Sequence, residues 1–566
     1  MVQDPSCAAA ERALLDGDAA GAVALYQARI AAAPADTDAR YGLASALAAA
    51  GDGAGGGAAL EEARTLHGLL IAKGAGADLA RMRTDGDYAA AIGAQIYAAQ
   101  HVATASVVLG RAVAAGHASH TGLLTYGLAL QHQARAEEAI AVFRAALQLY
   151  PDAGVHQFML YPHFMVENGP ARYAAEARAW AKRWTPEAEN PVFELPPLHG
   201  RRLRIGYVSP AFGALQVRQF ITPILENHDP AAAEVFLYPA TAEHEGGWPE
   251  HIAVRPIGHL PDADAAALIR SDAIDVLIDC WGHSAGNRLG VFARKAAPTQ
   301  VAWINFVQTT GLERMDYVLH ADSMAAPGTA ELFVEQVVSM GDVVIPYRPH
   351  TERPPASPTP ALARGQITFG SYNHPVKLSD ATVAAWSRIL KGRPDARLVL
   401  KYRYFIDPVL QAATRARFLA AGVAPARIEF RGQSDGADYL ASFAEIDLAL
   451  DPSPCPGGTT TCDAVANGVP VLTLAGSDFY SRIGVLVLEA CGMPELVAQS
   501  WDDYVARALA LTEDVVGLNA LRARVRPGFE AGPLRDEAGF TRRLEATLRD
   551  LAGQRLGSQG DARDAA

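Results

Sequence analysis

The stretch best suited to chemistry is Asp451-Pro-Ser-Pro-Cys-Pro-Gly-Gly-Thr-Thr-Thr-Cys-Asp463. An apolar run before it predicts a strand that ends near Asp451, and a helix is expected to begin around Thr459–Thr461. The first amide groups of a helix have no partners inside the helix, and with the helix dipole and three hydroxyl groups they favour an anion. The stretch therefore predicts a pyrophosphate site, although an ordinary helix that begins with threonine explains the same residues.

Asp463 lies about one helical turn after Thr459. A carboxylate at this place can accept hydrogen bonds from ribose hydroxyl groups, as acidic residues do in nucleotide-binding folds. We therefore expect Thr459, Thr460, Thr461 and Asp463 to bind a nucleotide together.

Nothing in the sequence calls for a metal. Aspartates separated by one residue occur at Asp16/Asp18, Asp85/Asp87 and Asp262/Asp264. All three pairs fall in predicted turns or at a predicted helix start, rather than after a buried strand, so we interpret them as helix caps or solvated side chains. The five cysteines are scattered, which argues against a zinc site or a disulfide framework and fits a reducing cytoplasm.

Residues 1–190 predict an all-α domain of helical repeats. If His120 is the first residue of a tetratricopeptide unit, Gly127 and Phe143 fall at positions where two helices touch. A second match includes Tyr26 and Gly42, and residues 87–116 resemble a degenerate unit. We expect a solenoid whose concave surface binds protein. A generic alanine-rich helical bundle is the alternative.

Beyond a proline-rich stretch at 191–197, short apolar runs alternate with helical segments, which is typical of α/β domains with parallel sheets. We expect two Rossmann-like domains that face a cleft, at 200–350 and 362–545. A second proline-rich stretch separates them. The polar residues 546–566 are expected to be disordered.

Composition excludes several classes of protein. Half of the residues are hydrophobic and 20% are charged, which excludes a disordered or coiled-coil chain. The formal net charge of −13 argues against nucleic acid as the main partner. No apolar run is long enough to span a bilayer, and the first residues do not resemble a signal peptide, so we expect a cytoplasmic protein without a membrane span.

The segment Gly457–Leu474, followed by Gly476-Ser-Asp-Phe-Tyr-Ser-Arg-Ile-Gly, closely resembles the C-terminal half of glycosyltransferase family 41. That family contains O-GlcNAc transferases, SPINDLY proteins and bacterial relatives with tetratricopeptide repeats. The likeness covers most of 201–545. It includes Leu203-Arg-Ile-Gly-Tyr-Val-Ser-Pro, Gly282-His-Ser-Ala-Gly-Asn-Arg-Leu, Ala297-Pro-Thr-Gln-Val-Ala-Trp and Gly370-Ser-Tyr-Asn-His-Pro-Val-Lys-Leu.

This resemblance implies a GT-B fold and an inverting, metal-free transfer of sugar to protein. It places Lys377 where the family has a pyrophosphate-binding lysine, and a cation there would stabilise the charge on the leaving diphosphate. It also implies that His374 contacts phosphate or sugar and that Tyr439 packs on the nucleobase. Gly458 belongs to the same implied donor site as Thr459–Thr461.

The sequence departs from the family in its N-terminal α/β half. Leu215 stands where the family often has an active-site histidine, and the family's Gly-Tyr-Pro-Gly-Thr-Thr/Ser-Gly loop reads Asn305-Phe-Val-Gln-Thr-Thr-Gly here. His283 follows a predicted strand, and the pKa of histidine suits a general base near neutral pH, so it is our candidate base. Asp279 is the competing carboxylate, and departure of the leaving group without a strong base is a further possibility.

We therefore expect a protein O-glycosyltransferase with catalytic residues Lys377 and His283. A UDP-sugar is the default donor, ahead of GDP-fucose and a CMP-linked nonulosonate. The acceptor is a serine or threonine of a protein held by residues 1–190, and flagellin is plausible because bacterial relatives of this layout modify it. Two alternatives are a catalytically degenerate repeat adaptor and a transferase that acts on a small molecule or glycan.

Overall fold

The computed structural model describes residues 5–15, 18–34, 36–60, 62–63, 78, 80–185, 191–241, 246–304, 308–349 and 353–564. The chain divides into two compact units, which we describe one at a time. The first consists of Met1–Val155, Ser357–Ser453 and Ser500–Ala520, and the second of His156–Ala356, Pro454–Gln499 and Leu521–Ala566. The first unit thus combines helical repeats with part of the C-terminal α/β half, and the predicted domain borders stay predictions.

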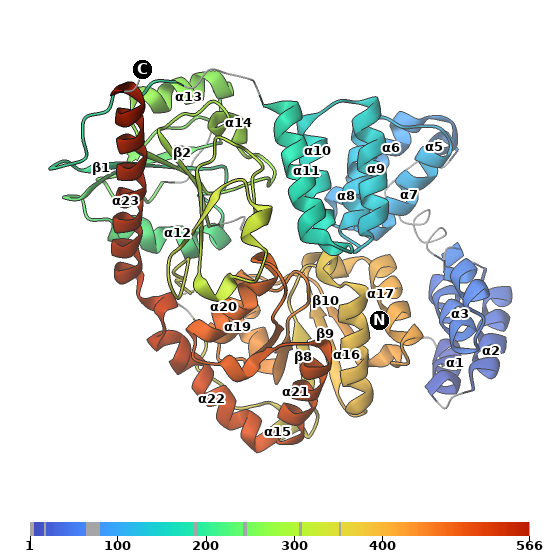
Figure 1. Cartoon of the computed structure of the whole chain (residues 1–566). Coiled ribbons are helices and arrows are strands. Elements are labelled where there is room, and N and C mark those ends of the chain that lie inside the picture. The colour runs from blue at the N-terminus through green and yellow to red at the C-terminus, as the bar shows by residue number, and fades with distance from the viewer. Residues whose placement is uncertain are drawn as a thin grey trace. The chain divides into compact units, whose positions relative to one another are not determined.

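Consecutive helices form the N-terminal part of the first unit, as the repeat pattern predicts. They are α1 (Pro5–Leu15), α2 (Ala19–Ala32), α3 (Thr37–Ala49), α5 (Arg81–Thr84), α6 (Gly86–Ala98), α7 (Val102–Ala114), α8 (His120–Gln131) and α9 (Ala136–Leu149). Helices α6 to α9 pack side by side (Figure 1). A Cβ atom at Gly127 would collide with the ring of Phe143, and one at Gly42 would collide with Tyr26. Glycine thus lets an aromatic ring pack directly on the neighbouring helix, which confirms the expected contact positions.

The aspartates considered as metal ligands act as caps and surface ion pairs. Asp18 accepts a hydrogen bond from the amide of Gly21 at 2.8 Å and caps α2. Asp85 caps α6 in the same way, and Asp262 pairs with Arg288 at 2.8 Å. Asp16 lies outside the described residues. Within the described chain, no group of three or more His, Cys, Asp or Glu side chains is arranged to hold a metal ion.

The first α/β half contains seven parallel strands in the order β3-β2-β1-β4-β5-β6-β7. They are β1 (Leu203–Ser209), β2 (Ala233–Pro239), β3 (Ala253–Val254), β4 (Val276–Asp279), β5 (Thr299–Ala302), β6 (Tyr317–His320) and β7 (Gln336–Ser339). Every residue of β4, β5 and β6 is buried, including polar ones such as Gln300 and His320, as is expected of parallel strands that are covered on both faces. The strands β2 and β3 lie on one side of β1 and the strands β4 to β7 on the other, and this order is that of a Rossmann-like sheet.

The second sheet repeats this topology in the order β10-β9-β8-β11-β12-β13. Its strands are β8 (Thr368–Ser371), β9 (Arg397–Lys401), β10 (Ile428–Arg431), β11 (Leu448–Leu450), β12 (Val471–Leu474) and β13 (Val497–Ala498). Its helices include α16 (Asp380–Gly392), α17 (Pro408–Ala420), α18 (Gly436–Ser442) and α19 (Thr459–Ala466). Two parallel sheets of this type, preceded by helices, confirm the predicted fold class.

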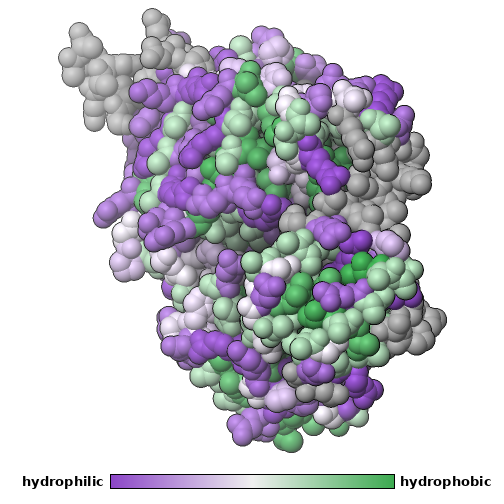
Figure 2. All heavy atoms as spheres, turned by 90° about the vertical axis from the view of Figure 1, so that its right-hand side faces the viewer, coloured by the Kyte–Doolittle hydropathy of each residue, from purple (hydrophilic) through white to green (hydrophobic). Residues whose placement is uncertain are grey.

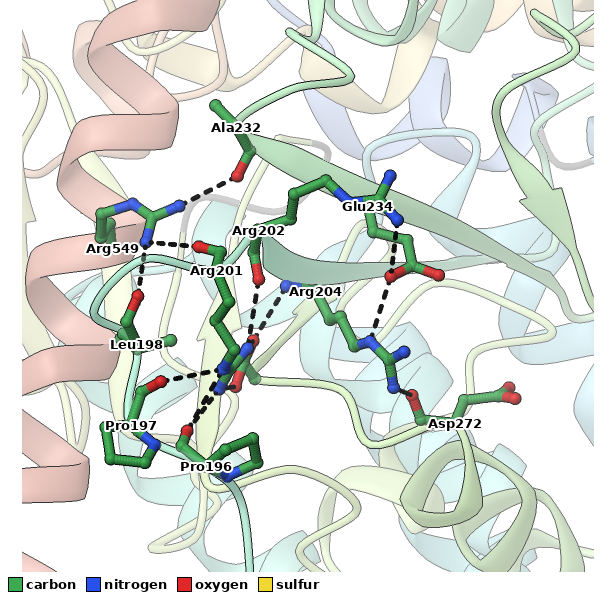
Figure 3. A network of polar contacts seen from close by, with 11 residues as sticks. Pro196, Pro197, Leu198, Arg201, Arg202, Arg204, Ala232, Glu234, Asp272 and Arg549 are labelled. Atoms are coloured by element: carbon green, nitrogen blue, oxygen red, sulfur yellow. Dashed lines mark hydrogen bonds and ion pairs between the residues drawn. The ribbon is translucent and has the colours of Figure 1, made fainter.

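The predicted disordered tail is wrong for the described residues after 545. Helix α23 (Glu537–Asp564) continues through this segment, and Leu548 and Ala552 are almost fully buried. The guanidinium of Arg549 donates to the carbonyl oxygen of Ala232 at 2.9 Å and to those of Leu198 and Arg201 (Figure 3). Buried side chains one turn apart and an arginine that donates to three carbonyl oxygens therefore order a segment whose composition alone indicates disorder.

Figure 2 shows hydrophilic side chains spread among hydrophobic ones over the face that it displays. No helix in the described ranges has both the length and the apolar character needed to cross a bilayer.

One buried carboxylate joins the repeats to the C-terminal α/β half inside the first unit. Asp407 is fully buried at the start of α17 and accepts from the amide of Val409 at 2.9 Å. It also accepts from the amides of Ala103 and Thr104 at 2.8 and 3.0 Å, and from the hydroxyl of Thr104 at 3.0 Å. The same side chain therefore caps α17 and the first turn of α7.

Replacing Asp407 with alanine should lower the free energy of unfolding by about 2–4 kcal/mol, because two helix starts each lose a cap worth about 1–2 kcal/mol. Chemical denaturation of the full chain measures this loss. Asp435→Ala is the matched control, since Asp435 also precedes a helix but its side chain makes no capping bond. Equal stability of the two variants would contradict the role given to Asp407.

Candidate active site

Lys377 lies on a short turn that directly follows β8. The turn ends in a 3₁₀ helix, Pro375–Lys377, and the half-buried Lys377 donates from Nζ to Oδ1 of Asn373 at 3.1 Å. Helix α16 begins three residues later, at Asp380, and is capped by Ser379. The turn therefore fixes the lysine at the carboxyl edge of the sheet, where ligands of parallel α/β domains bind.

The loop after β11 is held against this turn. The carbonyl oxygen of Ser453 accepts from Oγ of Ser379 at 2.6 Å and from Oγ1 of Thr382 at 2.9 Å. The amide of Ser453 donates back to Thr382 at 3.1 Å. Because β8 and β11 are parallel neighbours, their carboxyl ends meet at one edge, and these bonds join them there. The chain reaches Thr459 six residues after Ser453.

His374 is a neutral side chain in this turn. Its Nδ1 accepts from the amide of Val376 at 3.0 Å, which places the ring proton on Nε2. Burial lowers the pKa of His374 well below its usual value, and the nearby His132, Lys377 and Arg403 lower it further. The ring therefore stays uncharged at neutral pH, so Lys377 supplies the positive charge of the turn. A phosphate or sugar contact of His374 stays a prediction.

Tyr439 belongs to an aromatic cluster on the same unit. Its ring packs edge-on against Phe443, with centroids 5.2 Å apart, and lies 6.4 Å from the ring of Tyr372. Lys401 Nζ lies 5.9 Å from the centroid of Tyr372. The half-buried Tyr439 thus combines core packing with partial exposure, and nucleobase stacking stays a prediction.

The predicted threonine helix is present in the second unit as α19. It begins at Thr459 after Gly458, which precedes it without a side-chain cap. Thr459 and Thr460 are half-buried, and Thr461 is buried. A Cβ atom at Gly458 would meet only Ile483 Cγ2, at 3.8 Å, so there is room in front of the helix start. Backbone amides and hydroxyl groups therefore gather here as predicted, while anion binding stays a prediction.

Asp463 is buried and hydrogen-bonded to a distant tyrosine, which its sequence position does not indicate. Its side chain is buried and accepts from the hydroxyl of Tyr347 at 2.5 Å. That hydroxyl accepts in turn from the side-chain amide nitrogen Nε2 of Gln219 at 2.7 Å. Asp463 thus takes part in a buried polar chain of the second unit. Ribose binding by this carboxylate stays a prediction.

His283 is buried in the second unit after β4. Its Nε2 lies 2.8 Å from the carbonyl oxygen of Thr310, so this nitrogen carries the proton. Its Nδ1 lies 3.5 Å from the side-chain amide nitrogen Nε2 of Gln157. The ring packs edge-on against Trp180, with centroids 4.8 Å apart. Burial lowers the pKa of His283 to about 4. The imidazole is therefore neutral at pH 7, and its role as general base stays a prediction.

Glu335 bonds to Thr309 and Thr310, in the loop that also accepts the hydrogen bond of His283. Glu335 is not among the residues identified from the sequence. Its carboxylate accepts from the amide of Thr310 at 2.7 Å and from the hydroxyl of Thr309 at 2.7 Å. Burial raises the pKa of Glu335. It also raises the pKa of Asp279, to about 7, and the charge of Glu335 adds to this shift. Because no motif surrounds Glu335, nothing in the sequence distinguishes it.

Tyr173 links two predicted parts of the site within the second unit. Its hydroxyl donates to the carbonyl oxygen of Thr309 at 3.1 Å, and its ring lies 6.5 Å from that of His283. Tyr173 and Cys455 belong to one buried cluster. The proline- and glycine-rich loop that leads to α19 therefore packs next to the His283 loop. The side chain of Leu215 and residues Asn305–Val307 lie outside the described residues.

Replacing His283 with glutamine should remove part of the acid sensitivity of the fold. The unfolded chain binds a proton near pH 6.5 and the folded chain only near pH 4, so this residue costs the folded chain stability as pH falls between those values. The stability advantage of the wild-type protein over the variant should shrink by up to about 3 kcal/mol from pH 7.5 to pH 4.

Denaturant titrations across that pH range measure the difference. Replacement of the exposed His259 with glutamine is the control. A gap between wild type and His283→Gln that is constant with pH would contradict the neutral, buried state of His283.

Comparisons with known proteins show the family to which the chain belongs. The family model described as "Glycosyl transferase family 41" matches residues 151–345 and 359–544, which is more than half of the chain. The solved structure of a mutant Thermobaculum terrenum O-GlcNAc transferase is 28% identical, with a TM-score of 0.75, and the match covers 98% of each chain.

Curated relatives from plants are similar over the same region. "Probable UDP-N-acetylglucosamine--peptide N-acetylglucosaminyltransferase SPINDLY" from Petunia hybrida is 36% identical over 372 residues, which are 62% of this chain and 39% of the relative. The Oryza sativa protein of that name is 32% identical over 432 residues, 73% of this chain and 46% of the relative. The chain thus spans less than half the length of these curated relatives.

Proposed function

Because the chain belongs to glycosyltransferase family 41, we propose that it transfers a sugar from a nucleotide-sugar to serine or threonine of a protein. The observation that carries the proposal is the hydrogen-bonded pairing of two loops. The turn with Lys377 and the loop that leads to the Thr459 helix are joined by Ser453, Ser379 and Thr382. Ligands of parallel α/β domains bind at the carboxyl ends of neighbouring strands, and a lysine at this edge suits a diphosphate.

The reaction is a single displacement at the anomeric carbon. The acceptor oxygen forms a bond to this carbon while the bond to the diphosphate breaks, and the diphosphate leaves with the electron pair. Lys377 and the start of α19 stabilise the charge that it takes away, without a metal. The acceptor hydroxyl loses its proton to His283 Nδ1, which lacks a proton in the neutral ring. Asp279 is the alternative base, because its pKa of about 7 lies near the working pH.

The donor proposed is a UDP-sugar, because the names of the curated relatives specify UDP-N-acetylglucosamine. Those names also specify a peptide acceptor, which supports a protein acceptor here. We assign binding of the acceptor protein to the N-terminal helices. Flagellin, in the cytoplasm, is our first candidate for this acceptor. His374, Tyr439, Gly458, Thr460, Thr461 and Asp463 complete the proposed donor site.

A repeat adaptor without catalysis is the second candidate, because Leu215 replaces a family histidine. Such an adaptor has no need for a lysine and a threonine helix at neighbouring strand ends. Calorimetric titration of the wild-type protein with UDP, GDP and CMP separates the two functions. Absence of binding to all three nucleotides would favour the adaptor.

Lys377→Ala should reduce turnover by about 10²- to 10³-fold, because the leaving diphosphate loses its cation. The intact mass of flagellin co-expressed with the protein measures turnover, and the mass increment identifies the sugar. Lys391→Ala removes an exposed lysine of α16 and should keep full activity, and thermal unfolding verifies both folds. Wild-type turnover in Lys377→Ala would remove the proposed leaving-group role.

Treatment with EDTA should leave turnover unchanged within about twofold, since cations of the protein and backbone donors stabilise the diphosphate. The intact mass of purified flagellin after incubation with the purified protein and a UDP-sugar, with and without added Mg²⁺ or Mn²⁺, gives the result. A strict requirement for either ion would overturn the metal-free mechanism.

A further inference from the structure

We propose that the helical repeats complete the donor site, because His132 of the repeats holds His374 and thereby the turn that carries Lys377. This inference rests on the proposed function and deepens it. It makes His132 a positioning residue for binding of a nucleoside diphosphate. All residues concerned belong to the first unit.

His132 stands directly after α8 and packs against residues of the C-terminal α/β half. Its ring centroid lies 4.7 Å from that of His374 and 4.9 Å from that of Tyr404. The planes of His132 and Tyr404 are inclined by only 23°, so these two rings stack. Nδ1 of His132 lies 3.2 Å from the hydroxyl oxygen of Tyr97 on α6. Two repeat helices thus contribute to one aromatic cluster beside the Lys377 turn.

The two histidine rings of this cluster are neutral. Burial lowers the pKa of His132 to about 3, and burial also lowers that of His374. Tyr404 is 5% exposed, and its hydroxyl accepts from Arg403 at 3.0 Å. The cluster therefore acts through packing and hydrogen bonds rather than through charge.

His374 transmits this position to Lys377 through its own turn. The ring accepts from the amide of Val376, and the carbonyl oxygen of His374 accepts from the amide of Lys377 at 3.0 Å. The ring of His374 also lies 4.6 Å from that of Tyr402, between centroids. A shift of the His374 ring would therefore move the backbone that places Lys377. A displacement of about 1 Å is enough to weaken a charge-assisted contact severely.

A second contact shows that the repeats are firmly attached at this place. Asp407 lies three residues after Tyr404 and bonds to the amides of Ala103 and Thr104. Tyr404 and Asp407 therefore contact α8 and α7 from one short segment. The repeats thus contact the turn that carries Lys377 and the segment next to it. This contact is separate from their proposed role in capturing the acceptor protein.

The test is calorimetric titration of the full chain with UDP. His132→Ala removes the ring and should weaken UDP binding by about tenfold or more. His132→Phe keeps a flat ring against His374 and Tyr404, and its affinity should stay within about threefold of wild type. His120→Ala, at the opposite end of α8, is the control and should bind UDP as the wild-type protein does.

The titrations distinguish this inference from the proposed function. If the wild-type protein binds UDP and His132→Ala binds it equally well, the positioning role fails while the function stands. A loss as large in His132→Phe as in His132→Ala would likewise overturn it, since the ring would then not be the cause. Absence of UDP, GDP and CMP binding in the wild-type protein would instead remove the function itself. Should His132→Ala fail to fold, His132→Leu fills the space without an aromatic ring and should show the same tenfold loss.

Discussion

Hydrogen bonds between the loop after β11 and the start of α16 are the constraint on which the proposed site depends. Ser453 bonds through both its amide and its carbonyl oxygen, so its loop has little freedom relative to Ser379 and Thr382. The two strands that carry these loops are parallel neighbours. Without this junction, the turn that carries Lys377 and the loop after β11 would move independently of each other within the first unit.

Burial then decides which groups carry charge. His132, His283, His320 and His374 all have lowered pKa values, chiefly because their surroundings exclude water. These histidines are therefore neutral at pH 7, and all four pack against aromatic rings. Asp279 and Glu335 shift in the opposite direction for the same reason. Lys377, which is only half-buried, supplies the positive charge of its turn.

The fold class could be predicted well because it depends on local patterns. Buried parallel strands require continuous apolar runs, and paired helices require a small residue opposite an aromatic one, as at Gly127 and Phe143. Burial of Asp463 by Tyr347 and of His283 by Trp180 could not be predicted, because each partner is more than 100 residues away in the sequence. The prediction of disorder for residues 546–566 was wrong for a related reason. The order of this segment comes from hydrogen bonds between Arg549 and carbonyl oxygens that are distant in the sequence.

The sequence by itself determined the strands, the helical repeats, the threonine helix and the membership of glycosyltransferase family 41. Each of these depends on residues that are adjacent or regularly spaced in the sequence, so each can be recognised without coordinates. Only the tertiary structure decided that the repeats contact the Lys377 turn through His132 and the start of α17 through Asp407. That contact joins segments separated by more than 200 residues, and its stability comes from burial of rings and a carboxylate that no local pattern records.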